Sequence, residues 1–599
     1  MSRLGARLED AVAGTAIVAL AAIPIGEAVL RRTLGVGIPA AGPIAQHLVL
    51  WVAFLGAAIA ARDGGLLSFS GASLAPDGPW RRALVVAAAA CGACVALILA
   101  WGGIELLRIE RESASSIGAG IPTWVTQLVF PIGLGLIAWR QVRHGGERWI
   151  GRWAAASGLA VAAVLLWNPR LIEGAPAWPI AAAAVIAAAA GTPIFAVLGG
   201  MAALLFMADG VTPAAVLVET YALNTSPMLP AIPLFTLAGF LLAEGRTPTR
   251  LLRVFRAGCG WMPGGTAVVC VLLCSFFSVF TGGSGVTILA LGGLLFPALL
   301  ADGYRERFAV GLLTGSGSLG LLLPPALPLI LYGVVAQLPL EDLFIAGLLP
   351  GMLLMVLGAA WGVREGLVRR TGRQAFSAPE LGRALWGARW EVLMPALVLA
   401  VLITGLATAV EAAAIAALYA LVIQLARRDI ADAGQLRRVI AECVSVVGGV
   451  LLILGTAVGL TSFLVSAGVP ALLLSWTREW VASPVVFLLA LNGFLLLVGC
   501  VMDIFSAIVV VVPLVAPLAE AYGIHPVHLG ILFIANLELG YLTPPVGLNL
   551  FLASYRFKRP VLDVARAALP MLGILGAGVL LITYVPALSL ALLRVLGRL

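Results

Sequence analysis

Long apolar stretches separated by short polar ones recur along almost the whole chain of 599 residues. A helix that spans a bilayer needs about 20 mostly apolar residues. The first such stretches lie near residues 11–30, 46–61, 83–104 and 121–139, followed by a run at 153–167. Later stretches are richer in Gly and Pro, and lie near 178–207, 214–243, 264–300, 309–335, 343–362, 392–409, 411–425, 440–467, 484–519, 529–553 and 567–594. The pattern predicts an all-α polytopic membrane protein.

Composition supports a membrane location and excludes several classes of function. Hydrophobic residues make up 61% of the chain and charged residues 11%, whereas soluble domains carry roughly 25% charged residues. The net charge of +8 comes from arginines in short loops, where membrane proteins carry them, so nucleic-acid binding is not expected. Cys91 and Cys94 have a C-x-x-C spacing without nearby His or acidic partners, which predicts no transition-metal site. The chain has no P-loop motif and therefore no predicted nucleotide hydrolysis of its own.

Three parts with different patterns are expected along the chain. Residues 1–145 form a four-helix unit whose first apolar stretch is read as a retained helix, because further spans follow it. Residues 146–175 form a connector that either crosses the membrane or lies along its surface. Residues 176–599 form a larger domain in which the Gly- and Pro-rich spans are concentrated.

One element of the larger domain occurs twice. The segment GLLTGSGSLGLLLPP at 311–325 returns as ILFIANLELGYLTPP at 531–545, 220 residues later, with six of fifteen positions identical. Each copy holds a Gly and a Pro-Pro pair inside an apolar stretch, and Pro-Pro forbids a regular helix. Two broken helices are therefore predicted. Broken helices at corresponding positions of internal repeats indicate the binding site of a transporter.

The two spans before these elements are too long for a single crossing. Residues 264–300 and 484–519 are each expected to form a re-entrant helical hairpin. If the second hairpin enters and leaves on one side, five crossings separate the start of the span at 309 from the span at 529, and an odd number inverts the second copy. Inverted repeats place the substrate site near the membrane midplane and work by alternating access.

Polar residues inside predicted spans are costly and are functional candidates by default. They gather around the two repeats: Ser284, Thr287, Ser316, Ser318, Asp503, Ser506, Asn536, Glu538 and Thr543. Hydroxyls, an amide, a carboxylate and carbonyls freed where a helix breaks are oxygen ligands that suit a hard cation such as sodium. The alternative is that Ser, Thr and Gly only allow close helix packing, and the pattern leaves this reading open.

At these residues the chain resembles a known family. The runs TGGSGVTILALGGLLFPALLADGY, GSGSLGLLLPPALPLILYG and NLELGYLTPPVGLNLF resemble the large membrane subunit of the tripartite ATP-independent periplasmic (TRAP) transporters. IPLFTLAGFLLAEG at 232–245 and MPGG at 262–265 are similar to early segments of that subunit. The four-helix unit, with ARDGG at 61–65, is similar to the small membrane subunit. The resemblance implies a natural fusion of both subunits.

The resemblance also implies a mechanism. It predicts a sodium-coupled importer of organic acids in the bacterial inner membrane, which receives a small carboxylate from a periplasmic substrate-binding protein without an ATPase subunit. It implies an elevator movement of the hairpins and broken helices within the lipid bilayer, driven by two or more Na⁺ ions. Such a protein is not an enzyme.

The resemblance implies three sets of site residues. The first sodium site comprises Gly282, Gly283, Ser284, Thr287, Ser316, Gly320 and Pro324. The second comprises Asp503, Ser506, Asn536, Gly540, Thr543 and Pro544. The substrate is expected near Ser284, Gly285, Ser318, Pro325, Pro545 and Asn549.

Two questions stay open at this level. A stand-alone sodium–anion symporter could share the repeats and hairpins yet need no binding protein, although the four additional N-terminal helices argue against it. The substrate is not specified either, because selectivity in a tripartite system lies largely in the binding protein. C4-dicarboxylates, sugar acids, amino acids and other carboxylates all fit the sequence.

Overall fold

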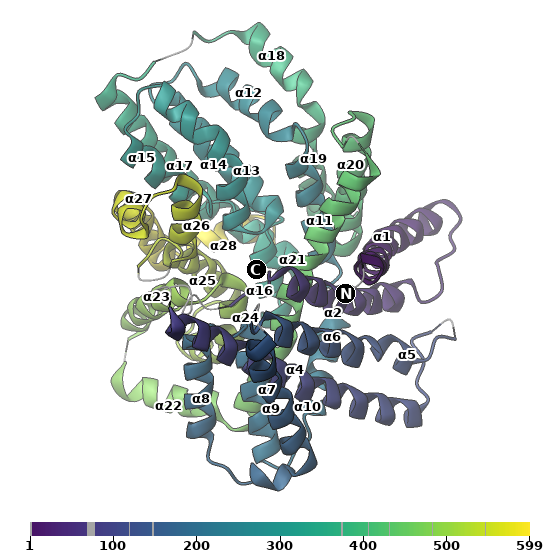
Figure 1. The fold of residues 1–599 in the computed structure, drawn as a ribbon. Coiled ribbons are helices and arrows are strands. Elements are labelled where there is room, and N and C mark those ends of the chain that lie inside the picture. Colours follow the sequence, from purple (N-terminus) through teal and green to yellow (C-terminus); the bar gives the residue numbers. More distant parts are fainter. Residues whose placement is uncertain are drawn as a thin grey trace. The chain divides into compact units, whose positions relative to one another are not determined.

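The computed structural model describes residues 3–68, 78–118, 120–146, 149–372, 375–404, 406–430, 432–481, 483–544 and 547–599 (Figure 1). These residues fold almost entirely into helices, as the apolar pattern predicts. Eleven helices in the described ranges are long and apolar enough to cross a membrane, or twelve if one bent pair counts as a single span. The chain divides into two compact units, residues 1–234 with 436–472, and residues 235–435 with 473–599.

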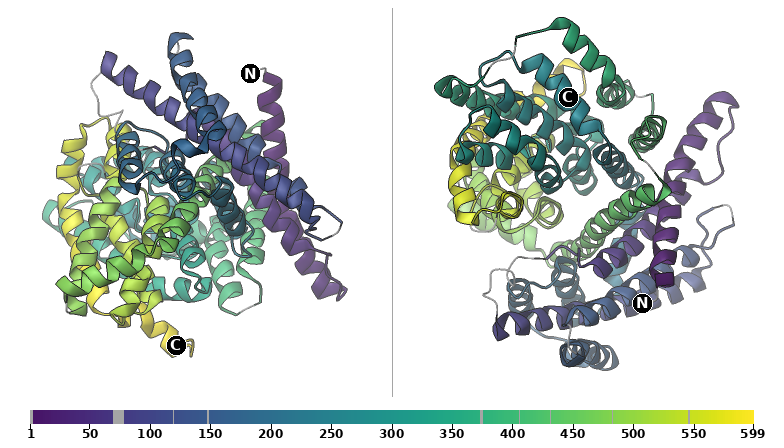
Figure 2. Two further views of the ribbon diagram at one scale, coloured as in Figure 1. Left: turned by 90° about the horizontal axis from the view of Figure 1, so that it is seen from below. Right: turned by 45° about the horizontal axis from the view of Figure 1, so that its top comes forward.

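The first unit contains the N-terminal helices and most of one long later helix. Its helices are α1 (Arg3–Thr33), α2 (Ala41–Asp63), α4 (Pro79–Ser113), α5 (Thr123–Gln127), α6 (Val129–His144), α7 (Trp149–Trp167), η1 (Pro169–Leu171), α8 (Ala177–Ala189), α9 (Ile194–Ala208), α10 (Ala214–Asn224) and most of α21 (Ala433–Ser466). Figure 2 shows the length of α1 and α4, in purple and blue.

Small residues allow the helices of this unit to pack closely. Within the connector, α7 packs along α4, and a Cβ on Gly158 would lie 2.0 Å from the carbonyl oxygen of Ala90. α2 approaches α21 in the same way, since a Cβ on Gly56 would lie 2.2 Å from the carbonyl oxygen of Val444. Such backbone contact is typical of helix pairs in membranes, where van der Waals packing drives association.

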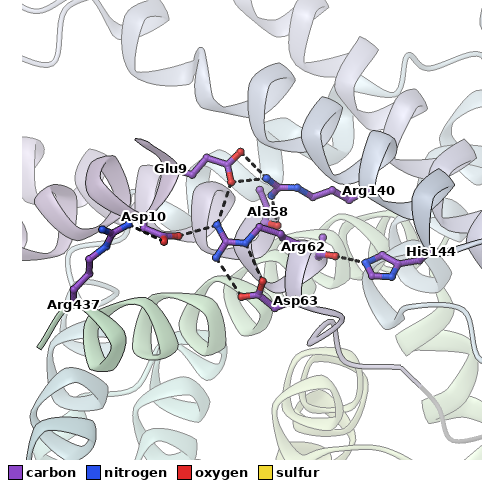
Figure 3. A network of polar contacts seen from close by, with 9 residues as sticks. Glu9, Asp10, Ala58, Arg62, Asp63, Arg140, His144 and Arg437 are labelled. Carbon is purple, nitrogen blue, oxygen red and sulfur yellow. Dashed lines mark hydrogen bonds and ion pairs between the residues drawn. The ribbon is translucent and has the colours of Figure 1, made fainter. Parts of the chain in front are cut away.

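A network of charged side chains joins four helices of the first unit (Figure 3). Glu9 of α1 pairs with Arg140 of α6, whose side chain is only 4% exposed. The neighbouring Asp10 accepts hydrogen bonds from Arg62 of α2 at 2.9 Å and from Arg437 of α21 at 3.2 Å. Charge pairing therefore holds α1, α2 and α6 to α21.

The second unit contains the repeated elements. Its helices are most of α11 (Ala231–Glu244), α12 (Thr247–Cys259), α13 (Gly265–Thr281), α14 (Ser284–Ala301), α15 (Glu306–Ser316), α16 (Leu327–Ala336), α17 (Leu340–Arg369), α18 (Ala378–Gly387), α19 (Arg389–Ile403), α20 (Ala409–Ala426), most of α22 (Val469–Trp480), α23 (Pro484–Val501), α24 (Ile504–Ala521), α25 (Pro526–Gly540), α26 (Leu548–Phe557), α27 (Val561–Tyr584) and α28 (Ala587–Val595).

The repeat extends well beyond the matching segments. The series from α13 to α17 returns as the series from α23 to α27, with each helix starting about 220 residues later. The packing is reciprocal as well: α14 contacts α26 while α24 contacts α16, and α15 contacts α27 while α17 contacts α25. Reciprocal contacts of this kind are those of a two-fold relation between equivalent halves.

Three predicted spans are each divided into two helices. The span expected at 178–207 is interrupted before Pro193, where Gly191 adopts a φ of +87°. The span at 214–243 is interrupted at 225–230, which contains two prolines, and the span at 567–594 is interrupted before α28. Proline lacks a backbone donor and disfavours helix in the residue before it, which accounts for these breaks.

Candidate functional site

In the first repeat, two interruptions of helical structure lie against each other. Gly282 and Gly283 separate α13 from α14, and residues 317–326 separate α15 from α16. Gly282 has a φ of +64°, and a Cβ at this position would lie 2.6 Å from the Cβ of Leu327. Only glycine fits such a tight turn beside the start of α16. Predicted residues Pro324 and Pro325 lie in the second interruption, where both are buried.

The break in the first broken helix packs directly on the end of α13 and the start of α14. A Cβ on Gly320 would lie 2.2 Å from the carbonyl oxygen of Ser275, and one on Gly317 would lie 3.3 Å from the carbonyl oxygen of Ser284. The break therefore brings backbone carbonyls close to the tip formed by Gly282 and Gly283.

Buried hydroxyls line this contact. Ser278 of α13 donates a hydrogen bond to the carbonyl oxygen of Gly317 and lies 3.1 Å from the hydroxyl of Thr287. The hydroxyls of Ser275, Ser284 and Ser316 are buried and have no hydrogen-bond partner among the described residues. Hydroxyl and carbonyl oxygens that lack donors are suitable ligands for a hard cation.

The second repeat has the equivalent arrangement. Met502 and Asp503 separate α23 from α24, and residues 541–547 separate α25 from α26. A Cβ on Gly540 would lie 2.5 Å from backbone atoms of Gly499, and the backbone N–H of Gly547 donates to the carbonyl oxygen of Cys500 at 3.0 Å. The second break thus packs on the end of α23, as the first packs on the end of α13.

Asp503 caps the start of α24. Its carboxylate accepts hydrogen bonds from the backbone N–H groups of Phe505 at 3.0 Å and Ser506 at 3.1 Å, and from the hydroxyl of Ser506 at 2.5 Å. Asp is a favoured N-cap residue, so this contact has a structural role. Because a carboxylate offers about four acceptor positions, the cap leaves capacity for a cation.

Tyr541 links the second break to the same helix start. Its hydroxyl accepts a hydrogen bond from the backbone N–H of Ile504 at 2.7 Å. Predicted residue Thr543 bonds within its own segment, since its hydroxyl donates to the carbonyl oxygen of Leu539 at 2.9 Å. Pro544 is exposed, and Pro545 lies outside the described residues.

Asn536 takes part in a buried network. Its amide group donates to the side-chain oxygen of Asn492 at 2.6 Å and to the carbonyl oxygen of Leu532 at 2.8 Å. The Asn492 oxygen also accepts from the hydroxyl of Thr583 on α27 at 3.1 Å. The network connects α25 to α23 and α27. Two helical positions further on, Glu538 is 3% exposed, and neither of its carboxylate oxygens has a hydrogen-bond partner in the described ranges.

The residues predicted near the substrate connect the two repeats. Asn549, at the start of α26, is fully buried and donates to the carbonyl oxygen of Thr314 on α15 at 3.2 Å. A Cβ on Gly285 would lie 2.3 Å from a methyl group of Leu552 on α26. Ser318 is buried and lies within the first break. The tip of the first repeat therefore packs against the broken helix of the second.

Sequence reasoning missed several polar residues at these contacts. Ser275 and Ser278 lie on successive turns of α13, and Asn492 and Thr583 lie in α23 and α27. The spacing of Ser275 and Ser278, three residues apart and close to a predicted hairpin tip, was the available signal for the first pair. The signal for Asn492 was weaker, since it was only that a polar residue lies inside a predicted span.

Comparisons with known proteins agree with this architecture. Residues 180–588 match the model of the DctM component of tripartite ATP-independent periplasmic transporters, and residues 20–151 match that of the DctQ component. The isethionate TRAP transporter permease protein DctMQ of Oleidesulfovibrio alaskensis is 29% identical over 515 residues, covering 84% of this chain and 80% of that protein.

Other relatives match the larger part of the chain. The C4-dicarboxylate TRAP transporter large permease protein DctM of Pseudomonas aeruginosa is 34% identical over 67% of this chain and 93% of its own length. The ectoine TRAP transporter large permease protein TeaC of Halomonas elongata is 30% identical over 60% of this chain and 85% of its own.

Among solved structures, the YdaH transporter of Alcanivorax borkumensis has a TM-score of 0.41 at 17% identity, covering 60% of this chain and 86% of its own. The family matches cover most of the chain in two consecutive parts. The chain therefore belongs to the tripartite ATP-independent periplasmic transporter family, with the small and large membrane components fused in one multi-pass protein of the inner membrane.

Proposed function

We propose that this protein imports organic acids together with sodium, receives its substrate from a periplasmic binding protein, and works by an elevator movement. The observation that carries the proposal is the pairing of each helix break with a helix tip in both repeats. Relatives named for C4-dicarboxylate, isethionate and ectoine support a small organic acid as the substrate class.

Oxygen ligands support the sodium coupling. In the first repeat, Ser275, Ser284 and Ser316 present buried hydroxyls without partners among the described residues, beside backbone freed by the break at Gly317. In the second repeat, Asp503 supplies a negative charge at the start of α24. Sodium coordinated at these two places would neutralise the carboxylate and satisfy the hydroxyls, which makes both tips more stable when the ion is present.

The repeat arrangement supports alternating access. We count α15 and α16 as one broken crossing. The helices α17, α19, α20 and α21 then complete five crossings before α23, so that the second repeat is inverted. In the proposed movement, the hairpins α13–α14 and α23–α24 travel with both broken helices. The N-terminal four-helix part and the connector α7 belong to the fixed scaffold, and the ion pairs between α1, α2, α6 and α21 hold that scaffold together.

Direct sodium binding tests the coupling without a known substrate. Purified protein in nanodiscs is titrated with radioactive sodium in a potassium buffer. The proposal expects saturable binding to at least two sites, weakened by Ser284→Ala at the first tip and by Asp503→Asn at the second. Sodium binding that is absent, or unchanged in both variants, would contradict the assigned sites.

A further inference from the structure

The helices α12 and α18 carry a basic and aromatic surface that neither the sodium sites nor the substrate site uses. The two helices pack against each other in the second unit, and Figures 1 and 2 show them side by side. Arg246, Arg250, Arg253 and Arg256 recur along α12, and no acidic residue lies between Arg246 and Cys259. Residues 364–390, which include α18, contain six arginines and two glutamates.

Much of this charge has no counterpart within the protein. Arg250 is paired with the buried Glu391 and Asp429, and Arg256 lies 3.9 Å from Asp302. Arg253 and Arg383, by contrast, are exposed, and in the described ranges the structure gives neither of them a carboxylate partner. Two exposed guanidinium groups on adjacent helices therefore favour an anionic ligand from outside the chain.

Exposed aromatic side chains accompany the arginines. Trp386 of α18 is 70% exposed and Trp390 of α19 is 39% exposed. The guanidinium group of Arg389 lies over both rings, 4.3 Å from the centre of the first and 5.1 Å from the centre of the second. Tryptophan and arginine together are typical of the membrane–water interface, where an apolar ring and a charged group are both accommodated.

The orientation of α18 relative to α19 favours a lipid as the anionic ligand. α18 is bent by 70° from α19 at Ala388, and the pair together is apolar enough to count as a candidate span. If α19 crosses the bilayer, α18 lies near the membrane plane with no buried residue of its own. The arginine-rich stretch around it places this end on the cytoplasmic side, where anionic lipids attract basic segments.

We propose that α12 and α18 form a binding surface for the headgroups of anionic phospholipids, with Arg253 and Arg383 as phosphate contacts and Trp386 inserted among the acyl chains. The helix of the second repeat that corresponds to α12 is α22. It also exposes tryptophans, Trp476 and Trp480, but its Arg478 is followed by Glu479 and the helix has no net charge, whereas α12 carries three arginines and no acidic residue. The preference for anionic lipid is therefore confined to the α12–α18 surface, so that the two repeats differ in their lipid contacts.

The test is short-range fluorescence quenching of the full chain in proteoliposomes. Membranes of phosphatidylcholine contain an equal fraction of either brominated phosphatidylglycerol or brominated phosphatidylcholine, in potassium buffer. The contribution of Trp386 is obtained by difference from a Trp386→Phe variant. We expect stronger quenching by the brominated anionic lipid, corresponding to a local enrichment of roughly fivefold for each arginine involved. High potassium chloride should remove the difference by screening.

A paired set of variants assigns the effect to the arginines. Arg253→Gln with Arg383→Gln should bring quenching by the two lipids to the same level, whereas Arg478→Gln on α22 should leave the difference unchanged. All three side chains are exposed, so folding should be preserved. Equal quenching by both lipids in the wild-type protein would overturn the proposal, because the contact would then be apolar only. Absence of quenching by either lipid would overturn it too, since the surface would lie outside the bilayer.

Discussion

Asp503 gives the sharpest test of the sodium assignment, because its structural and its ionic role can be separated. Asp503→Asn removes the negative charge but keeps a side-chain oxygen for the helix cap, and Asn caps helices about as well as Asp. The substitution turns one carboxylate oxygen into an NH₂ group, which accepts no hydrogen bond. The two backbone N–H groups donate to the same oxygen of Asp503, so the hydrogen bond from the hydroxyl of Ser506 to the other oxygen is the one expected to be lost. That loss should lower the free energy of unfolding by about 1 kcal/mol.

The effect on sodium should be larger. Interactions with a charged group contribute about 1.5–3 kcal/mol net, so replacing the carboxylate with an amide should raise the half-saturating sodium concentration by about ten- to more than hundredfold. The assay is sodium-dependent uptake in proteoliposomes, with thermal unfolding measured in parallel. Asp563→Asn is the matched control, since that carboxylate is 58% exposed on α27. A stable Asp503→Asn protein with an unchanged sodium requirement would mean that Asp503 only caps α24.

Three further predictions follow from the packing. Gly320→Ala should lower the free energy of unfolding by about 1–3 kcal/mol and abolish uptake, because the new Cβ would meet the carbonyl oxygen of Ser275. Thermal unfolding and uptake assays measure both effects. In the same assays the control Gly576→Ala on α27, where nothing lies within 4 Å of the new Cβ, should be neutral or stabilising. Arg140→Ala should lower the free energy of unfolding by about 1–3 kcal/mol in denaturant titrations, because it removes the nearest partner of Glu9 and leaves that carboxylate only Arg62, at 3.7 Å. Arg437→Ala, at a side chain 48% exposed, should change the free energy of unfolding by less than about 1 kcal/mol. Ser284→Ala should raise the half-saturating sodium concentration for uptake with at most about 1 kcal/mol lost in stability, because this buried hydroxyl has no hydrogen-bond partner among the described residues. A sodium requirement equal to that of the wild type would remove this hydroxyl from the first site.

The helix breaks of the two repeats were predicted from the sequence because their signals are local, whereas the breaks before Pro193, at 225–230 and before α28 were missed although prolines mark them. Gly282 and Gly283 at one tip, and the Pro-Pro pair after Gly320, restrict the backbone wherever they occur. The same is true of Asp503, an N-cap residue between two apolar helices. Length alone was enough to divide 264–300 and 484–519 into helix pairs.

The polar partners of these breaks could not be predicted in the same way. Nothing in the local sequence distinguishes Ser278 from other serines in membrane helices. Its partner, the carbonyl oxygen of Gly317 after the end of α15, reaches it only in the folded chain. Asn492 and Thr583 likewise become part of the Asn536 network only through the packing of α23 and α27 on α25. Ser and Thr are common in membrane helices for reasons of packing, so their presence alone does not mark a site.

The contact between α1 and α21 could not be predicted from the sequence either. Arg437 is separated from Asp10 by 427 positions along the chain, and no local pattern relates them. The predicted division at residues 145 and 175 rests on the pattern of spans, and it stays a prediction.

The most direct test of the proposed function is uptake into proteoliposomes of candidate organic acids, measured with and without an inward sodium gradient and with and without the periplasmic binding protein encoded nearest the gene. The account predicts uptake only when both the gradient and the binding protein are present. Uptake without the binding protein would contradict it and would indicate a stand-alone symporter, and uptake driven equally well by a potassium gradient would contradict the sodium coupling.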